Sequence, residues 1–292
     1  MADRMSIAML IGPIKKDFGI GDFQASVLVG AAFTSFYVLF LIPIGFAADR
    51  FSRRKVLAVC LFIWSLATIA CGWVEGFVAL FVMRMLVGAG EAGLAPCVHG
   101  IIGDSFPREA MAKPLALQGI GFQVGSAVGV AAAGAVLAAG AAGGFSGLPI
   151  IGDMPAWRIA FVVIGIPGMA ALLLIPLLHD PKEAVVKPAN AAQQAPLMPF
   201  LKENRVLVSL ALLSAGFSAM SLGAVTAWVP EYLQRVQGIP PMQTGALLGS
   251  LLLLAAFAGQ GLYAIVVEWF AARGEYARHT AAASVAGYVV GL

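Results

Sequence analysis

The chain has 292 residues, of which 60% are hydrophobic and 11% are charged, and its mean hydropathy is +0.91. A soluble globular domain is nearer half apolar, so this composition excludes one. The formal net charge is only +3, and the placement of the basic residues is more informative than their sum. We expect such a chain to be embedded in a lipid bilayer and to bind no nucleic acid.

Apolar runs of membrane-spanning length follow one another along the sequence. A helix needs roughly 20 residues to cross a bilayer. Two runs, 1–12 and 280–292, are shorter than that. Seven others reach or approach it: 23–48, 56–73, 77–103, 114–141, 157–178, 205–233 and 242–267. The sequence therefore predicts an all-α, polytopic transmembrane helix bundle.

A polar stretch over 179–204 divides this series of runs. Its four prolines and its Ala/Gln-rich segment are typical of a linker. Six helices, a linker and further helices form the plan of a transporter with two six-helix halves. The predicted domains are an N-terminal half over 1–178 with a partial first helix, a cytoplasmic linker over 179–204, and a partial C-terminal half over 205–292 with helices 7 and 8 and the start of helix 9.

The apolar segments at the two ends of the chain are short. Residues 1–11 would rise only about 17 Å as a helix, which is too little to cross a bilayer. Residues 280–292 are apolar and carry no basic flank. We therefore expect a truncated bundle that runs from the end of helix 1 to the start of helix 9. A naturally short protein with eight spans is the alternative.

A basic turn joins the runs 23–48 and 56–73. It contains Asp49, Arg50, Arg53, Arg54 and Lys55. If the loops are assigned alternately to the two sides of a membrane, 12 of the 18 Lys and Arg residues fall on the side of this turn and four on the other, with two inside spans. Because basic residues accumulate in cytoplasmic loops, the bias places this turn and the N-terminus in the cytoplasm.

Four charged residues lie inside predicted spans: Asp3, Arg4, Arg84 and Glu91. Charges at membrane depth are costly and are functional candidates by default. Arg84 and Glu91 are seven residues apart, so they lie within about 20° of the same helix face. Glu91 is near the middle of its span, where a carboxylate could load and release a proton. A purely structural ion pair between Arg84 and Glu91 is the alternative reading.

Several other residues carry weaker predictions. Gly121, Gly125 and Gly129, at four-residue intervals, favour close helix packing. Asp104, at the cytoplasmic end of the Glu91 span, is expected to pair with Arg53 or Arg54. The sequence predicts no metal site and no cofactor, because the remaining candidates are isolated histidines and apolar-run cysteines: His99, His179, His279, Cys60, Cys71 and Cys97.

The basic turn resembles a loop of the major facilitator superfamily of transporters. The shared pattern is Gly-x-x-x-Asp-Arg-x-x-Arg-Arg, here with Gly45, Asp49, Arg50, Arg53 and Arg54. A weaker copy with the same spacing follows six helices later, where Ala264, Glu268 and Arg273 take the places of Gly45, Asp49 and Arg54. The resemblance implies a major facilitator type of bundle. From their positions, we expect Asp104 and these residues of the turn to form a cytoplasmic gate; a purely structural contact is the alternative.

Four local matches make the chain similar to the Spinster-like branch of this superfamily, with the organic-anion symporter branch second. They are Asp3-Arg4, Arg84 to Glu91-Ala92, Asp104-Ser-Phe-Pro107 with Arg108, and Trp228-Val-Pro230-Glu-Tyr232-Leu-Gln-Arg235. The resemblance implies transport of lysolipids or other amphipathic molecules, often coupled to protons. It also implies that Asp3 and Glu91 are the proton-linked acids and Arg4 their partner cation.

We therefore expect a secondary active, proton-coupled transporter that moves a small amphipathic or anionic organic solute, or a lysolipid, by alternating access. The expected setting is a monomer in the bacterial inner membrane. A membrane-embedded enzyme is one alternative, but it would need converging His/Asp or Ser/His residues that the sequence does not offer. A non-transporting receptor or assembly subunit is the other, and it would not need acids at the midplane.

Overall fold

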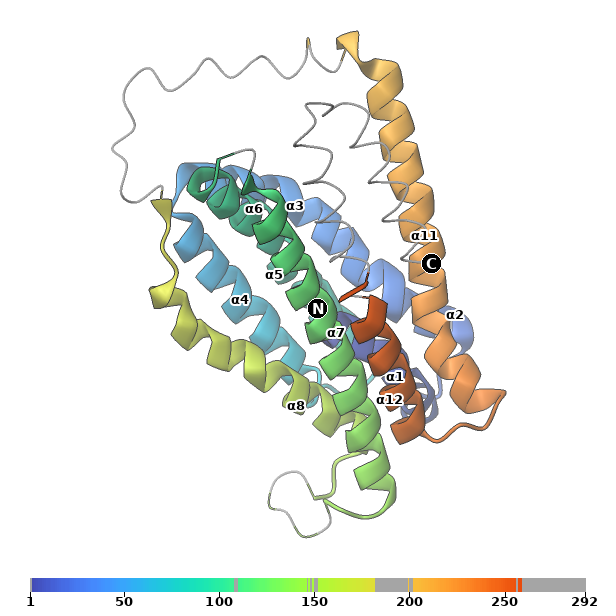
Figure 1. Ribbon diagram of the computed structural model, residues 1–292. Coiled ribbons are helices and arrows are strands. Elements are labelled where there is room, and N and C mark those ends of the chain that lie inside the picture. Colours follow the sequence, from blue (N-terminus) through green and yellow to red (C-terminus); the bar gives the residue numbers. More distant parts are fainter. Residues whose placement is uncertain are drawn as a thin grey trace.

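The computed structural model covers residues 1–292 and describes residues 2–107, 110–145, 147, 149, 152–181, 199, 202–255, 257 and 258. Within these ranges every regular element is helical, and the long helices run side by side as a bundle (Figure 1). The elements are α1 (Ala2–Phe18), α2 (Asp22–Ser26), the π-helix η1 (Val27–Ala31), α3 (Ala32–Arg50), α4 (Arg53–Ala70), α5 (Phe77–Glu91), α6 (Leu94–Ser105), α7 (Ala112–Ala141), α8 (Ala156–Ala171), the 3₁₀-helix η3 (Leu172–Leu177), α11 (Arg205–Arg235) and α12 (Pro241–Ala255).

Several helical segments match the predicted spans. In the described part of the chain, four are long and apolar enough to cross a membrane: Asp22–Arg50, Phe77–Ser105, Lys113–Ala141 and Ala156–Leu177. The helices α4 and α11 occupy the predicted runs 56–73 and 205–233. The all-α transmembrane prediction is confirmed. The second copy of the basic-turn pattern, the run 280–292, Arg108 and most of 179–204 lie outside the described residues.

The first helix is longer than its apolar run. The run ends at residue 12, but α1 continues to Phe18 and carries Lys15 and Lys16 in its last turn. Basic side chains are favourable there because the carbonyl groups at a helix C-terminus carry partial negative charge. Hydropathy alone therefore underestimated this helix by six residues.

The predicted single helix over 77–103 is interrupted after Glu91. α5 ends there and α6 begins at Leu94. Pro96 accounts for the break, because a proline has no N–H to donate to the carbonyl group four residues earlier, at Ala92, and its ring crowds that group. The last α-helical bond of α5 runs from Ala92 N–H to Gly88 O, and the chain then tightens, because Gly93 N–H donates to Gly90 O, only three residues earlier. Glu91 is thus the last residue of a helix at membrane depth.

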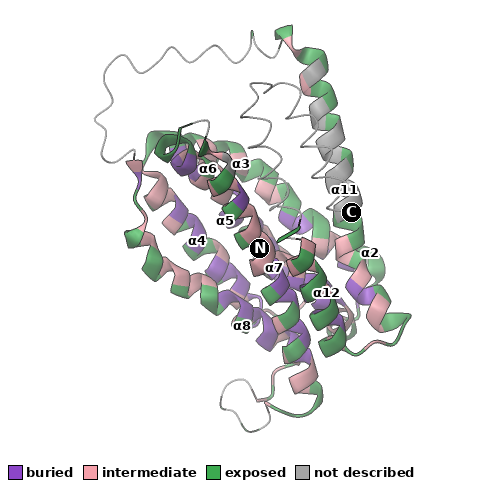
Figure 2. Ribbon diagram, in the orientation of Figure 1, coloured by how far each residue is buried: buried purple, intermediate pink, exposed green. Residues whose placement is uncertain are grey.

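The main apolar core joins α1 to α5, α7 and α8. Leu10 and Ile14 of α1 pack with Leu80 of α5 and with Trp157 and Phe161 of α8. Buried residues concentrate on the inner faces of these helices, whereas the outer faces are exposed (Figure 2). Large apolar side chains on the outside are the expected lipid-facing surface of a membrane bundle.

A close helix contact on α7 is defined by Gly134. An added Cβ at Gly121 or Gly125 would meet no described atom within 4 Å, and because residues 259–292 lie outside the described part, the seam of Gly121, Gly125 and Gly129 stays a prediction. The close approach is further along, where a Cβ at Gly134 would lie 2.6 Å from Pro241 O and 3.2 Å from the Cα of Gly245. α7 therefore packs against the start of α12, and the partner helix decides which small residues are used.

Candidate transport site

A buried charged cluster lies between α1 and α5. Asp3 is 5% exposed, Arg84 is fully buried and Glu91 is 1% exposed. Arg84 Nη1 and Asp3 Oδ2 are 3.9 Å apart. Thr68 of α4 donates its hydroxyl to Trp64 O at 2.8 Å, and the same oxygen lies 3.5 Å from Asp3 Oδ2. Two helices thus place two acids and a guanidinium in one dry region, and a third adds a hydroxyl group.

An aromatic ring from α3 completes this cluster. The guanidinium carbon of Arg4 lies 4.9 Å from the Phe33 ring centroid, and that of Arg84 lies 5.7 Å from it. The face of an aromatic ring attracts cations, most strongly where water is excluded. Phe33 stacks in turn on Tyr37 at 5.7 Å. Phe33 therefore holds two arginines near each other without neutralising either of them.

Arg84 keeps hydrogen-bonding capacity in this cluster. None of its three guanidinium nitrogens donates a hydrogen bond to another described residue. A buried guanidinium with unmade hydrogen bonds is costly, and such a group is usually matched by an ion, a ligand or water. Arg84 can therefore bind an anionic group in addition to facing Asp3.

Glycines bring the neighbouring helices close to α5. A Cβ at Gly88 would overlap the carbonyl oxygen of Phe33, and one at Gly90 would lie 2.8 Å from Trp64 N. A Cβ at Gly93 would overlap Cys60. These glycines thus let α5 pack closely against α3 and α4, and the contact fixes Phe33 beside the charges.

The structure agrees with the predicted burial of the site residues but gives Arg84 a different ion-pair partner. Arg84 and Glu91 are both buried, as expected for residues on an inward face, but the ion pair that the geometry defines joins Arg84 to Asp3 on α1. Sequence reasoning missed Phe33 and Thr68. The only sequence signal for them is an aromatic and a hydroxyl residue within otherwise apolar runs, and such residues are common in membrane helices.

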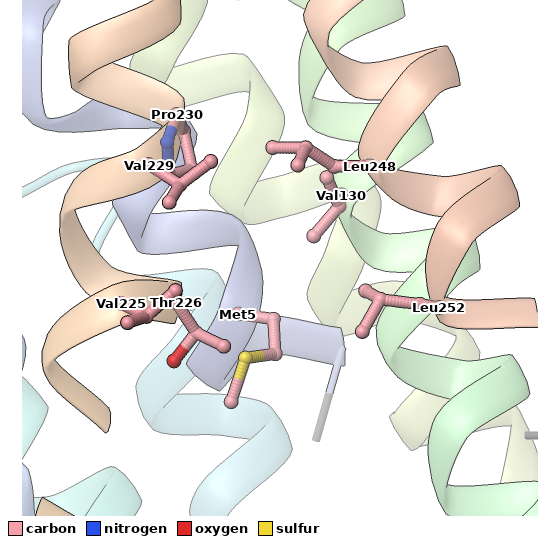
Figure 3. A pocket seen from close by; sticks show the side chains of 8 residues that line it. All are labelled: Met5, Val130, Val225, Thr226, Val229, Pro230, Leu248 and Leu252. Carbon is pink, nitrogen blue, oxygen red and sulfur yellow. The ribbon is translucent and has the colours of Figure 1, made fainter. Parts of the chain in front are cut away.

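A small apolar cavity of about 110 Å³ lies between α1, α7, α11 and α12. Met5 lines it from α1, two residues after Asp3 (Figure 3). The other lining residues are apolar except for Thr226: Val130, Val225, Thr226, Val229, Pro230, Leu248 and Leu252. The cavity can take a short apolar group and offers it almost no polar partner.

The basic turn is tied to α6. Arg53 forms an ion pair with Asp104 and donates from Nη1 to Gly100 O at 2.7 Å. The expected pairing of Asp104 with Arg53 is therefore confirmed. Gly100, one turn before Asp104, makes room for this contact, because a Cβ there would lie 2.7 Å from Arg53 Cζ. Gly45, the glycine of the turn pattern, makes no comparable close contact with the described residues, because an added Cβ there would meet no described atom within 4 Å.

Asp180 is a second anchor of the turn, and sequence reasoning missed it. Its Oδ2 accepts from Ser52 Oγ and from Arg54 N–H, both at 3.2 Å, and Asp180 is only 2% exposed. Ser52 is itself the N-cap of α4. The carboxylate therefore sits at the positive end of a helix, where an anion is favoured. Asp180 ties the start of the predicted linker to the turn between α3 and α4.

Replacing Asp180 by asparagine should loosen the first turn of α4. Loss of the charge-assisted acceptor at a helix N-terminus costs about 1 kcal/mol. Hydrogen–deuterium exchange of peptides spanning residues 52–57 should therefore speed up by about fivefold if local opening controls exchange. His179→Ala is the matched control, because His179 is adjacent and exposed. Equal exchange in both variants would show that Asp180 does not hold this turn.

The bundle and its buried charges define a class of protein. Helices of membrane length surround two acids and two arginines. These are features of a membrane transporter. The sequence model of the Major Facilitator Superfamily matches residues 1–292, and the chain belongs to that family. Its members among the relatives are transporters and not enzymes.

Individual relatives agree with this assignment. Protein spinster of Drosophila melanogaster is 29% identical over 79% of this chain and 36% of its own length. The probable L-galactonate transporter of Escherichia coli (strain K12) is 28% identical over 91% of this chain and 58% of its own. The crystal structure of a bacterial homologue of the human lysosomal transporter Spinster, in an inward-facing and unoccupied conformation, matches with a TM-score of 0.73 and 28% identity, over 93% of this chain and 60% of that one.

These comparisons confirm the Spinster-like resemblance. They also show that the chain spans between about a third and three fifths of the length of these relatives. An integral membrane location follows from the family and from the membrane-length helices.

Proposed function

We propose that the chain forms part of a proton-coupled secondary transporter that moves an anionic or amphipathic organic solute by alternating access. The N-terminal half is residues 1–178, the linker is 179–204, and 205–292 begins the C-terminal half. The buried cluster of Asp3, Arg84 and Glu91 carries this proposal. A structural bundle has no need for two acids and a guanidinium at membrane depth, where each charge is costly.

The cluster supplies the parts that proton coupling requires. Glu91 and Asp3 are the groups that we assign to proton uptake and release. Arg4 and Arg84 are the groups that compensate the ionised acids or, alternatively, an anionic substrate. The ionised acids and an anionic substrate compete for the same two arginines. Substrate binding and proton binding are therefore linked.

The surroundings of the cluster support the substrate class. Arg84 has hydrogen-bonding capacity for a carboxylate or phosphate group. The apolar cavity is lined by Met5, two residues after Asp3 on α1, and suits an apolar portion of the same molecule. One relative is named as a probable L-galactonate transporter, and others as Spinster proteins, so both sugar acids and lysolipids are sensible probes.

The orientation and the cytoplasmic gate belong to the same proposal. The excess of basic residues supports a cytoplasmic N-terminus and a cytoplasmic 50–55 turn, in a bacterial inner membrane. We assign Gly45, Asp49, Arg50, Arg53, Arg54 and Asp104 to a gate on that side. The ion pair of Arg53 with Asp104 supports this assignment, since it links the turn to the end of α6. The proposed unit is a monomer.

Transport in liposomes tests the proposal. The complete transporter, reconstituted with a pH-sensitive dye inside, should acidify or alkalinise the lumen when L-galactonate or a lysophosphatidate is added. A pH gradient should in turn drive accumulation of the same compound. Proton movement with neither probe, and no accumulation under a gradient, would count against proton-coupled transport of this substrate class.

A further inference from the structure

A second charged network lies at the opposite end of the bundle from the 50–55 turn. The segment Asp22–Arg50 is a 29-residue helical span, so its two ends are about 40 Å apart. The network contains Lys15 at the end of α1, Asp22 at the start of α2, and Glu231 and Arg235 near the end of α11. Figure 1 shows the lower end of α11 beside α2.

The four charges alternate in sign along a chain of ion pairs. Glu231 Oε1 lies 3.8 Å from Lys15 Nζ. Lys15 also pairs with Asp22 Oδ1, and the other oxygen of Asp22 lies 3.6 Å from Arg235 Nη1. The order is thus Glu231, Lys15, Asp22, Arg235. The first and last links cross from the N-terminal half to α11, while the middle link lies within the N-terminal half.

The two crossing links are unequal. The side chains of Lys15 and Glu231 are 16% and 12% exposed, whereas those of Arg235 and Asp22 are 60% and 57% exposed. Ion pairs in water contribute little because solvent screens them, and partly buried pairs are screened much less. The pair of Lys15 with Glu231 therefore holds most of the electrostatic attraction between the halves at this end.

The backbone of α1 is shaped for this contact. Gly12 faces Glu231, and a Cβ there would lie 3.1 Å from Glu231 Oε2. One turn earlier on α1, the sulfur of Met9 accepts a hydrogen bond from Gln234 Nε2 of α11 at 3.7 Å. Further along the same face, Met5 and Pro230 line the apolar cavity. The contact between α1 and α11 thus runs from the charged network to the apolar cavity.

We infer that this network is the lock that closes the transporter on the side away from the 50–55 turn. This inference rests on the proposed alternating-access function. Opening on that side requires α1 and α2 to separate from α11, and both crossing ion pairs must then break. The network therefore favours the inward-open state. Its strength sets how much substrate-binding or proton-binding free energy is needed to open the other side.

Spin-label distances in the complete transporter test the lock. One pair of labels, at Asp153→Cys and Val236→Cys, reports on the lock side. A second pair, at Ser105→Cys and Glu203→Cys, reports on the other side. All four positions are exposed, and Cys60, Cys71 and Cys97 are buried.

Glu231→Gln should raise the ratio of outward-open to inward-open molecules by at least about fivefold. The distance distribution should lengthen on the lock side and shorten on the other side. Lys15→Gln should do the same, and the double variant should add little to either single variant because the two residues act as a pair. Arg235→Gln should change the ratio by less than about twofold, as expected for an exposed pair.

Lys16→Gln is the matched control. It removes the same charge one residue away, from an exposed position, and should leave both distributions unchanged. The lock is overturned if Glu231→Gln and Lys15→Gln leave the distances as they are in the wild type, or if Lys16→Gln shifts them equally. These distances do not depend on transport, so failure of the liposome assay would reject the proposed function without deciding the lock.

Discussion

Replacing Gly88 by alanine should destabilise the bundle by about 3 kcal/mol, because the new methyl group would overlap a backbone atom. The Cβ would fall on the carbonyl oxygen of Phe33, which cannot swing away as the end of a flexible side chain can. α3 and α5 would have to separate, and the ring of Phe33 would move from beneath Arg4 and Arg84. The apparent melting temperature of the purified protein in detergent should fall by several degrees.

Gly121→Ala is the matched control for this prediction. Gly121 is exposed on α7, and an added Cβ would meet no described atom within 4 Å. The substitution also removes a glycine from a helix interior, which is neutral or favourable for helix stability. An equal loss of thermal stability in the two variants would show that helix contact at Gly88 is not what limits stability.

The positions of the spans could be predicted because the bilayer imposes a single strong requirement. Each crossing helix needs a long apolar run, and the described runs are helical over most of their expected lengths. The break after Glu91 had a sequence signal, Pro96, which hydropathy does not weigh. The extension of α1 through Lys15 and Lys16 was missed for a similar reason, since the helix end prefers basic residues that a hydropathy count rejects.

The pairing of residues from different helices could not be predicted from one sequence. Arg84 and Glu91 were expected on one face of the same helix, yet the ion pair that the structure defines joins Arg84 to Asp3 on α1. Periodicity assigns a residue to a face but does not say which helix covers that face. The contacts of Asp180 with the 50–55 turn and of Glu231 with Lys15 join residues far apart in the chain for the same reason.

Glu91→Gln should abolish pH-driven accumulation of substrate while leaving the fold intact. Glutamine has nearly the volume of a protonated glutamate, but it cannot release a proton. In the present structure Glu91 is 1% exposed at the end of α5, in the same dry region as Asp3 and Arg84. Its ionised form is tolerable there only with compensation from cations or water. Because alternating access changes that compensation, proton affinity should differ between the two states in the wild type.

The measurement is accumulation of radiolabelled substrate in liposomes with an imposed pH gradient, beside exchange of substrate between equal pools. The Gln variant should show no accumulation above protein-free liposomes, yet it should retain exchange, because exchange does not require the proton to leave. Glu75→Gln is the control, since Glu75 is exposed in the turn before α5, and it should accumulate substrate like the wild type. If Glu91→Gln still concentrates substrate with an unchanged pH dependence, Glu91 only packs within the cluster. Asp3, which faces Arg84 directly, would then be the acid that couples protons to transport.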